Sequence, residues 1–316
     1  MPTSADAVER AAGHLGDLAR RDVPLGPSTT YRVGGPAALF VEVDGEGSLA
    51  VLAETVRVTG VAVLVVGRGS NLLVADSGFA GVAVTLGERF ATVDIDGDRV
   101  VAGGAASLPV VARRTAAVGL TGFEWAVGVP GSIGGAVRMN AGGHGSDMAQ
   151  TLLGVRVLDL ATGEDVQVPA ADLDLGYRHS AIGPSQLVLT AELQLATGDR
   201  AASEATIAEI VRWRRAHQPG GANAGSVFTN PPGDSAGRLI DVAGAKGLRI
   251  GSAQVSPKHA NFIQADEGGR AADIVAVMAE VQRRVEASSG VHLEVETRLV
   301  GFADPLPDPR LEVEGS

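Results

Sequence analysis

Three pairs of polar side chains stand out from apolar or glycine-rich surroundings, and they are Tyr177 with Arg178, Ser226 with Asn230, and Glu294 with Glu296. A guanidinium pairs with carboxylates or phosphates, and a serine hydroxyl can donate a proton or contact a ligand. Each pair also has a purely structural explanation. The arginine would form a surface ion pair, the serine would bond its own backbone in a turn, and the glutamates would share the exposed face of a strand. These residues alone leave both explanations open.

The residue types exclude several other kinds of chemistry. Ser226 follows a glycine but precedes Val227 and Phe228, so the G-x-S-x-G elbow of a nucleophilic serine is absent. The chain contains no cysteine, which excludes disulfides, thiolate metal ligands and a cysteine nucleophile. The six histidines show no metal-ligand spacing, and we expect no metal site.

Two glycine-rich stretches could bind an anion through the backbone. Gly122–Gly145 is apolar and almost uncharged, and Pro130, Asn140 and its glycine pairs make it a poor regular helix or strand. Glycine permits positive φ and close approach to a ligand, and successive amides form an anion-binding nest. A tight connection between packed strands explains this stretch equally well. The second stretch, Gly67–Asn71, follows an apolar run, an arrangement that often holds phosphate. It is not the dinucleotide fingerprint, because Leu72 replaces the third glycine.

Hydrophobic periodicity predicts the elements that must position these residues. Helices are expected over residues 5–20, 47–60, 108–118, 205–215, 236–243 and 271–288. Strands are expected over residues 39–43, 61–66, 82–86, 90–95, 99–102, 152–159, 165–168, 187–195, 262–264 and 291–300. A change of composition at residues 197–202 indicates the end of the first part of the chain.

Composition limits the class of function. With 316 residues, 45% hydrophobic and 20% charged, the chain is typical of a soluble globular protein with two or three compact units. Its net charge of -11 disfavours a nucleic-acid partner. The N-terminus lacks the apolar core of a signal peptide, and no segment is long and apolar enough to span a bilayer. We therefore expect a cytoplasmic protein with small-molecule partners and no membrane association.

Six motifs carry a resemblance to a known family. In chain order they are GRGSNLLVAD, GVPGSIGGAVRMNAGGHG, YRHS, AGSVFTNP, SPKHANFI and ETRLVG. Together they resemble UDP-N-acetylenolpyruvoylglucosamine reductase, the flavoenzyme family that completes UDP-N-acetylmuramate in peptidoglycan synthesis. The similarity extends from about Thr29 to Gly301, and six motifs in the family's order are far more specific than any single one.

The resemblance implies an α+β fold. A p-cresol methylhydroxylase-type FAD-binding region, made of two α+β subdomains, would precede a smaller α+β substrate-binding domain. On this chain we expect the FAD-binding region, with its N-terminal helix, at residues 1–200 and the substrate-binding domain at residues 201–303. Residues 304–316 would form an acidic, proline-rich tail. We expect a monomer.

The resemblance also implies FAD, bound without a covalent bond, and NADPH as the hydride donor. The expected contacts to the FAD pyrophosphate come from Gly67, Arg68, Gly69, Ser70 and Asn71. The expected contacts around the flavin come from Gly128, Val129, Pro130, Gly131, Ser132, Gly134, Gly135 and Asn140.

Three residues match the family's catalytic positions. Ser226 corresponds to the serine that protonates the enolate after hydride has reached the vinyl carbon of the enolpyruvyl sugar nucleotide. Arg178 corresponds to the arginine that stabilises the carboxylate and the enolate, and Glu296, in E-T-R, to a glutamate that assists at the same centre. Tyr177 and Asn230 are expected to contact the sugar nucleotide. Because the charge develops only in the transition state, a fixed guanidinium and hydroxyl stabilise it selectively.

The sequence departs from the family's pattern at two positions. Thr229 stands where the family often has lysine, and His144 where it often has tyrosine. The extra loop tyrosine of one subtype has no counterpart between Tyr177 and Gln218, which indicates the shorter subtype. The rival hypotheses are a related FAD oxidase and a flavin or sugar-nucleotide binding protein without turnover. Retention of all three catalytic candidates favours the reductase.

Overall fold

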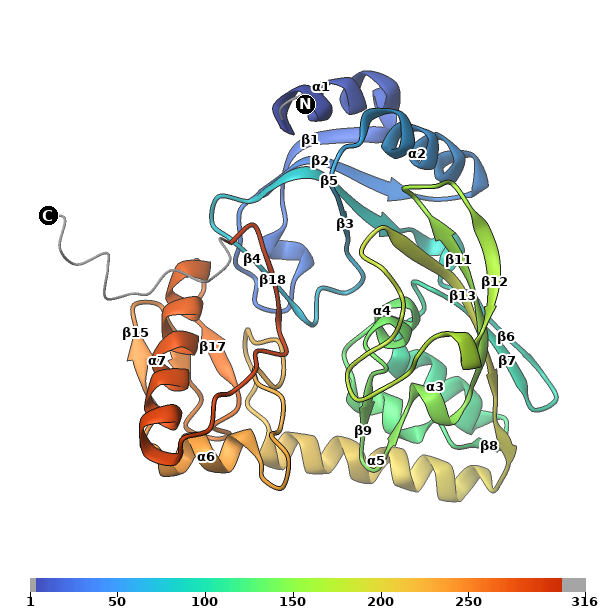
Figure 1. Cartoon of the computed structure of the whole chain (residues 1–316). Helices are drawn as coiled ribbons and strands as arrows, with labels where there is room; N and C mark the ends of the chain where they lie inside the picture. Colours follow the sequence, from blue (N-terminus) through green and yellow to red (C-terminus); the bar gives the residue numbers. More distant parts are fainter. Residues whose placement is uncertain (1–3, 303–316) are drawn as a thin grey trace, which may run out of the picture. The chain divides into compact units, whose positions relative to one another are not determined.

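The computed structural model describes residues 4–302, which form an α+β protein with two compact units (Figure 1). The first unit comprises residues up to Asp22, Ala38–Arg68 and Ala80–Arg214. The second comprises Val23–Ala37, Gly69–Phe79 and the residues from Arg215 onward. The expected α+β class is confirmed, and each unit draws on separated parts of the chain.

The helices of the described residues are α1 (Ser4–Leu15), α2 (Glu46–Thr59), α3 (Leu108–Ala117), α4 (Ile133–Arg138), α5 (Arg200–His217), α6 (Ala236–Val242) and α7 (Ala271–Ser289). The strands of the first half are β1 (Ala19–Pro24), β2 (Pro36–Val43), β3 (Val63–Val65), β4 (Leu72–Val74), β5 (Phe79–Leu86), β6 (Val93–Asp96), β7 (Arg99–Gly103), β8 (Leu120–Thr121), β9 (Gly142–Gly143), β10 (Ser146–Asp147) and β11 (Leu152–Asp159). The remaining strands are β12 (Asp165–Pro169), β13 (Gln186–Gln194), β14 (Ala196–Thr197), β15 (Arg249–Ile250), β16 (Ala253–Val255), β17 (Ile263–Ala265) and β18 (Arg298–Val300).

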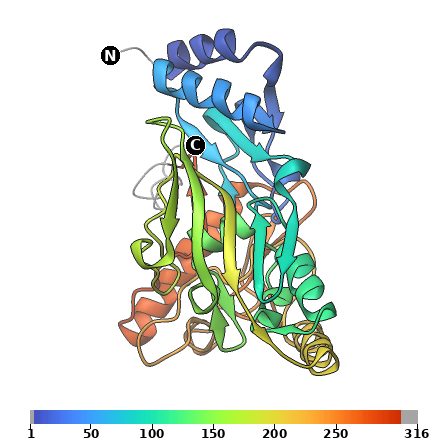
Figure 2. The same ribbon diagram turned by 90° about the vertical axis from the view of Figure 1, so that its right-hand side faces the viewer.

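A four-stranded sheet in the order β1-β2-β5-β3 leads into the glycine turn Gly67–Asn71. Its β3 pairs in parallel with β5 and runs directly into Gly67. Helices α1 and α2 lie side by side, as Figures 1 and 2 both show. The helix α2 ends at Gly60, whose φ of 65° is readily adopted only by glycine and lets its N–H bond the Val56 carbonyl. The sheet and helices bury one apolar cluster that includes Leu39 and Leu52.

The first unit also contains a five-stranded antiparallel sheet, in the order β12-β11-β13-β7-β6 (Figure 2). Alternating side chains such as Val155 and Val157 point into its core, as period-two patterning requires. The helix α4 packs against β13, and the 3-10 turn Glu124–Gly128 packs against α3. This packing brings the predicted flavin stretch onto the sheet.

The second unit has a three-stranded antiparallel sheet, β15-β16-β17, covered by α7. The apolar stripe of α7, including Ile274, Met278 and Val281, is buried in this core, as its helical periodicity predicts. In the same unit β18 pairs in parallel with β4, so the last strand of the described chain lies beside residues 72–74. That pairing brings the E-T-R motif next to the end of the glycine turn.

Asp76 fixes the start of α7 from a distant part of the chain. Its carboxylate accepts hydrogen bonds from the N–H groups of Ala271, at 2.8 Å, and Ala272, at 3.1 Å. These are two of the amides that a helix leaves without an internal partner at its N-terminus. An acidic side chain there is also favoured by the helix dipole.

Three expectations about local structure are wrong. The helix expected over residues 5–20 ends at Leu15, and the strand β1 begins at Ala19. The predicted terminal strand at residues 291–300 is a strand only over β18, because Phe228 makes an isolated bridge to Val295 and no continuous partner strand runs beside residues 291–297 in the described chain. The stretch Gly122–Gly145 contains the short helix α4, which Ser132 caps by accepting a hydrogen bond from the Gly135 N–H. Tertiary packing against β13 therefore overrides the weak helix propensity of Gly134 and Gly135.

The division into units falls somewhat later in the chain than the expected boundary at residue 200. The helix α5 runs from Arg200 to His217, and the division falls near its end, between Arg214 and Arg215. Two N-terminal segments, 23–37 and 69–79, belong to the second unit. The assignment of FAD and substrate binding to residues 1–200 and 201–303 stays a prediction, and the expected tail at residues 304–316 lies outside the described residues.

Candidate active site

A cavity of about 300 Å³ lies in the first unit, at the lower end of the size range of small-molecule sites. Five of the predicted cofactor residues line it, and they are Gly67, Arg68, Ser132, Gly134 and Gly135. The other walls come from Glu42, from residues 65–66, 85–88, 91 and 104–105, and from Arg138, Ile182 and residues 186–188. Residues of the two glycine-rich stretches, such as Gly67 and Ser132, which are 65 positions apart in the sequence, therefore meet at one cavity.

Close backbone approach explains why glycine stands at the cavity wall. A Cβ at Gly67 would lie 2.6 Å from the Ser132 Oγ, and one at Gly134 would lie 3.2 Å from the Gly104 carbonyl oxygen. The cations Arg68 and Arg138 add positive charge, and Arg138 also donates to the Gly183 carbonyl at 3.1 Å. Bare main chain and two guanidinium groups on this wall suit the diphosphate of a dinucleotide, which would have to lie away from the carboxylates Glu42 and Glu88 that also line the cavity.

The other predicted cofactor residues do not line this cavity. Gly128 packs against α5, since a Cβ there would lie 3.3 Å from Ile210 and 3.4 Å from Arg214. In the Val129–Gly131 segment the Gly131 carbonyl accepts the Leu108 N–H at 3.1 Å.

The residues Gly69, Ser70 and Asn71 belong to the second unit. A Cβ at Gly69 would lie 2.1 Å from the Ser28 carbonyl oxygen, and its φ of 59° also calls for glycine. The amide of Asn71 donates to the Glu296 carbonyl at 3.1 Å, and its own carbonyl accepts the Arg298 N–H at 3.0 Å. The end of the glycine turn is thereby tied to the E-T-R motif.

Asn140 is buried, and its side-chain amide bonds the protein itself. The Nδ2 group donates to the Gly176 carbonyl at 2.9 Å, and Oδ1 accepts the Ala149 N–H at 3.0 Å. These bonds hold the start of the Tyr177-Arg178 turn.

Arg178 occupies a strained turn. Its φ of 56° lies in the left-handed region, which is unfavourable for a residue with a Cβ atom, and a bridge between Gly176 and His179 closes the turn. Its Nη2 donates to the Gly142 carbonyl at 3.3 Å, and its guanidinium carbon lies 5.4 Å from the centre of the Tyr177 ring. Tyr177 is 64% exposed and thus accessible to a ligand.

Ser226 and Glu296 lie on neighbouring segments of the second unit. The Glu296 N–H bonds the Val227 carbonyl at 2.8 Å, and the Thr229 N–H bonds the Glu294 carbonyl at 3.0 Å. Ser226 is half-buried, and within residues 4–302 its hydroxyl makes no hydrogen bond. The structure thus brings together two of the three catalytic candidates, which are seventy residues apart in the sequence.

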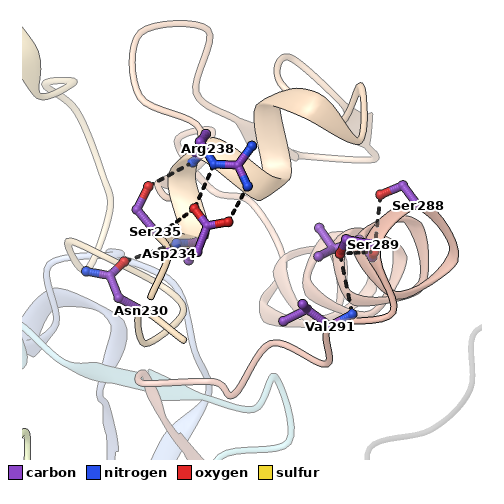
Figure 3. Close-up of polar contacts among 9 residues, drawn as sticks. Asn230, Asp234, Ser235, Arg238, Ser288, Ser289 and Val291 are labelled. Atoms are coloured by element: carbon purple, nitrogen blue, oxygen red, sulfur yellow. Dashed lines mark hydrogen bonds and ion pairs between the residues drawn. The ribbon is translucent and has the colours of Figure 1, made fainter. Parts of the chain in front are cut away.

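Asn230 has a structural contact at the start of α6 (Figure 3). Its Oδ1 accepts the Ala236 N–H at 3.1 Å, while the capping Ser235 accepts the Arg238 N–H at 3.3 Å. Arg238 itself pairs with Asp234, and this hydrogen-bonded pair lowers the pKa of Asp234 to about 2. The Nδ2 group of Asn230 remains available to a ligand, since no bond of that group to a residue in 4–302 is present.

Two half-buried arginines were missed at the level of sequence. Arg214 and Arg298 make no side-chain hydrogen bond or ion pair with any residue in the described part of the chain, and burial lowers the pKa of each guanidinium. Burying a cation without an anion is unfavourable, and within the described residues no anion offsets the burial of either guanidinium. The E-T-R motif was the available signal for Arg298, which lies two residues after Glu296 at the start of β18.

His144 is exposed, at φ 53°, and its ring makes an edge contact with Trp213 at 5.2 Å between centroids. No group of three or more metal-ligating side chains occurs within residues 4–302. No helix in that range is long and apolar enough to cross a bilayer.

Comparison with known proteins defines the class. Residues 37–168 match the FAD binding domain model, and residues 217–300 match the model described as UDP-N-acetylenolpyruvoylglucosamine reductase, C-terminal domain. The glycine-lined cavity lies largely within the first of these matches. The chain is thus an FAD-dependent oxidoreductase.

Relatives define the family. UDP-N-acetylenolpyruvoylglucosamine reductase of Heliobacterium modesticaldum is 44% identical over 281 residues, which are 88% of this chain and 89% of the relative. The protein of the same name from Acidiphilium cryptum is 43% identical over 309 residues, or 95% and 97% of the two chains. The crystal structure of UDP-N-acetylenolpyruvylglucosamine reductase (MurB) from Thermus caldophilus superimposes with a TM-score of 0.78 at 37% identity, over 89% of this chain and 99% of that one. The chain belongs to the UDP-N-acetylenolpyruvoylglucosamine reductase family.

Proposed function

We propose that this chain uses NADPH to reduce the enolpyruvyl group of UDP-N-acetylglucosamine enolpyruvate to UDP-N-acetylmuramate, a step of peptidoglycan synthesis. It acts as a cytoplasmic monomer on small-molecule substrates. The observation that carries the proposal is the pairing of the Glu296 N–H with the Val227 carbonyl. This bond sets the Ser226 hydroxyl, which has no hydrogen bond within residues 4–302, on the segment beside Glu296.

The cavity residues bind the cofactor. Gly67, Ser132 and Gly134 leave the main chain bare at the cavity wall, and Arg68 and Arg138 neutralise the FAD diphosphate. Bound FAD supplies the two-electron carrier between NADPH and the enolpyruvyl double bond. We assign this binding to residues 1–200 and substrate binding to residues 201–303.

The chain's own side chains manage charge and protons. Ser226 donates the proton that the substrate's enolate carbon requires, and Glu296 assists at the same centre. Arg178 pairs with the substrate carboxylate and stabilises the negative charge of the enolate. Tyr177 and the free Nδ2 group of Asn230 contact the sugar nucleotide.

The two further arginines extend this assignment. Arg214 and Arg298 are half-buried cations with lowered pKa values, and neither has an anionic partner within residues 4–302. We assign both to anionic groups of the ligands, because a ligand anion would offset the unfavourable burial of each charge.

Separate measurement of the two half-reactions tests the role of Ser226. In the Ser226→Ala variant, we expect NADPH to bleach the flavin under anaerobic conditions at nearly the wild-type rate. Reoxidation by the enolpyruvyl sugar nucleotide should slow by about 100-fold or more, the usual effect of losing one aligned donor. An equal fall of both rates would contradict the proton-donor role. Turnover that needs oxygen rather than the sugar nucleotide would indicate an oxidase, and a preparation that never takes up FAD would exclude both.

A further inference from the structure

Asn261 makes three hydrogen bonds to the loop that carries Ser226. Its Oδ1 accepts the Phe228 N–H at 3.0 Å, and its Nδ2 donates to the Phe228 carbonyl at 2.8 Å. Its main-chain carbonyl also accepts the Val227 N–H at 3.0 Å. Asn261 is only 4% exposed, so these bonds form away from competing water.

The opposite side of the same loop is held by the E-T-R segment. The Val227 carbonyl accepts the Glu296 N–H, and the Thr229 N–H bonds the Glu294 carbonyl. All main-chain polar groups of Val227 and Phe228 are therefore used. The position of the Ser226 hydroxyl, which bonds nothing else in residues 4–302, depends on this main chain alone.

Asn261 is itself held rigidly, in the loop between β16 and β17. Its N–H bonds the Nδ1 atom of His259 at 3.3 Å. At the start of the loop Ser256 closes a tight turn, with Oγ accepting the Lys258 N–H at 3.1 Å and N–H bonding the Phe262 carbonyl at 2.8 Å. A ligand-independent scaffold thus presents the amide to Phe228.

We propose that Asn261 is a positioning residue for the proton donor, acting through the main chain of Val227 and Phe228 on the hydroxyl of Ser226. The proposal rests on the proposed function of Ser226. Only an amide, or an equivalent group with one donor and one acceptor, can bond both the N–H and the carbonyl of Phe228. A misplacement of about 1 Å at a reacting group can slow a reaction by about 100-fold.

The variant Asn261→Asp tests this with almost no change of shape. Its carboxylate can still accept the Phe228 N–H but repels the Phe228 carbonyl. We expect the rate of flavin reduction by NADPH to stay within about twofold of wild type. The rate of sugar-nucleotide reduction should fall by about 10- to 100-fold, in kcat rather than in KM.

The pH profile of this variant separates positioning from general damage. The new carboxyl is buried, so its pKa should be raised. Once protonated, it offers an O–H donor and a carbonyl acceptor, the pattern of the native amide. The deficit relative to wild type should therefore shrink as the pH falls. A deficit that is constant or grows at low pH would overturn the proposal.

A double-mutant cycle gives the decisive comparison. If Asn261 acts through the serine hydroxyl, then Asn261→Asp should have little further effect in the Ser226→Ala background. A full multiplicative effect there would show a separate, merely structural role and would overturn the inference. If Ser226→Ala alone leaves sugar reduction unchanged, the proposed function of Ser226 fails instead, and the two failures are thus distinguishable.

Two further variants complete the design. Gln254→Glu makes the same amide-to-carboxylate change in the same unit, where Nε2 donates to the Gly247 carbonyl at 3.2 Å. It should leave both half-reactions within about twofold of wild type. If Asn261→Asp does not retain FAD, Asn261→Ser, which is uncharged, repeats the cycle. A normal rate of sugar reduction in Asn261→Ser would count against the proposal.

Discussion

At the scale of single residues, glycine and strain mark the candidate site. Arg178 is held at a φ of 56°, a conformation that is unfavourable for a residue with a Cβ atom, and Asn140 keeps its turn in place through the Gly176 carbonyl. The absence of a Cβ at Gly67 leaves room for the Ser132 hydroxyl, which would lie only 2.6 Å from a Cβ at that position. The unfavourable backbone conformation of Arg178 therefore occurs at a residue to which the proposed function assigns a role.

Gly67→Ala should weaken FAD binding. The added Cβ would lie 2.6 Å from the Ser132 Oγ, so the cavity wall or the cap of α4 must move. We expect the dissociation constant for FAD, measured by quenching of flavin fluorescence, to rise by about 10-fold, or about 1.4 kcal/mol. Gly143→Ala is the matched control, because a Cβ there meets nothing within 4 Å. Equal affinities of the two variants would exclude this role of Gly67.

At the scale of elements, long-range contacts join short segments into sheets and caps. The three-residue strands β4 and β18 stabilise each other by parallel pairing, although neither would persist alone. The helix α7 depends on a carboxylate nearly two hundred residues away for its N-terminal cap. The loop Ser256–Phe262 depends on its own internal bonds.

Asp76→Ala should destabilise the second unit. It removes the acceptor for two amides of α7, and loss of such a cap typically lowers the free energy of unfolding by about 0.5–2 kcal/mol. Urea unfolding followed by circular dichroism measures the change. Asp241→Ala is the control, since it breaks an exposed pair with Lys246 that contributes at most about 1 kcal/mol. A larger loss for the control than for Asp76→Ala would refute the capping role.

Acid should destabilise the loop that holds Asn261. Burial lowers the pKa of His259 below its ordinary value of about 6.5. As the pH falls through that value, the unfolded chain binds a proton before the folded one does, so the free energy of unfolding decreases. Above about pH 7.5 the His259 imidazole is neutral in both states, so its titration should no longer change the free energy of unfolding. Urea unfolding at pH 7.5 and 5.5 should therefore show a smaller decrease for His259→Asn than for wild type, and an identical decrease would contradict the assignment.

At the scale of the whole molecule, the residues of the proposed function are divided between the two units. Arg178 and the glycine-lined cavity belong to the first, whereas Ser226, Glu296 and Arg298 belong to the second. Neither unit contains all the groups that the proposed reaction requires. The connection between them includes α5, whose residues Arg200–His217 run across the division.

FAD should stabilise the folded chain by mass action. A ligand that binds only the folded state adds about 2.7 kcal/mol to the free energy of unfolding at 100 times its dissociation constant. Thermal unfolding of the flavin-free protein, repeated at rising FAD concentrations, measures this directly. The Tm should rise steadily with FAD, and AMP at the same concentrations should have a smaller effect. A Tm independent of FAD would contradict flavin binding.

The sequence by itself determined the α+β class, the family and most helices and long strands. Periodicity and ordered motifs are local properties, and they predicted α2, α3, α7 and β13 with small errors at their ends. It also named Ser226, Arg178 and Glu296, whose roles stay predictions.

Only the tertiary structure decided which of the named residues meet. It separated Gly67 from Gly69 into different units, joined Glu296 to the Ser226 loop, and showed that the amide of Asn140 is bonded to the protein. It also revealed Asn261 as the residue that bonds Phe228. Such contacts depend on hydrogen bonds between segments far apart in the chain, which no local pattern of residue types encodes.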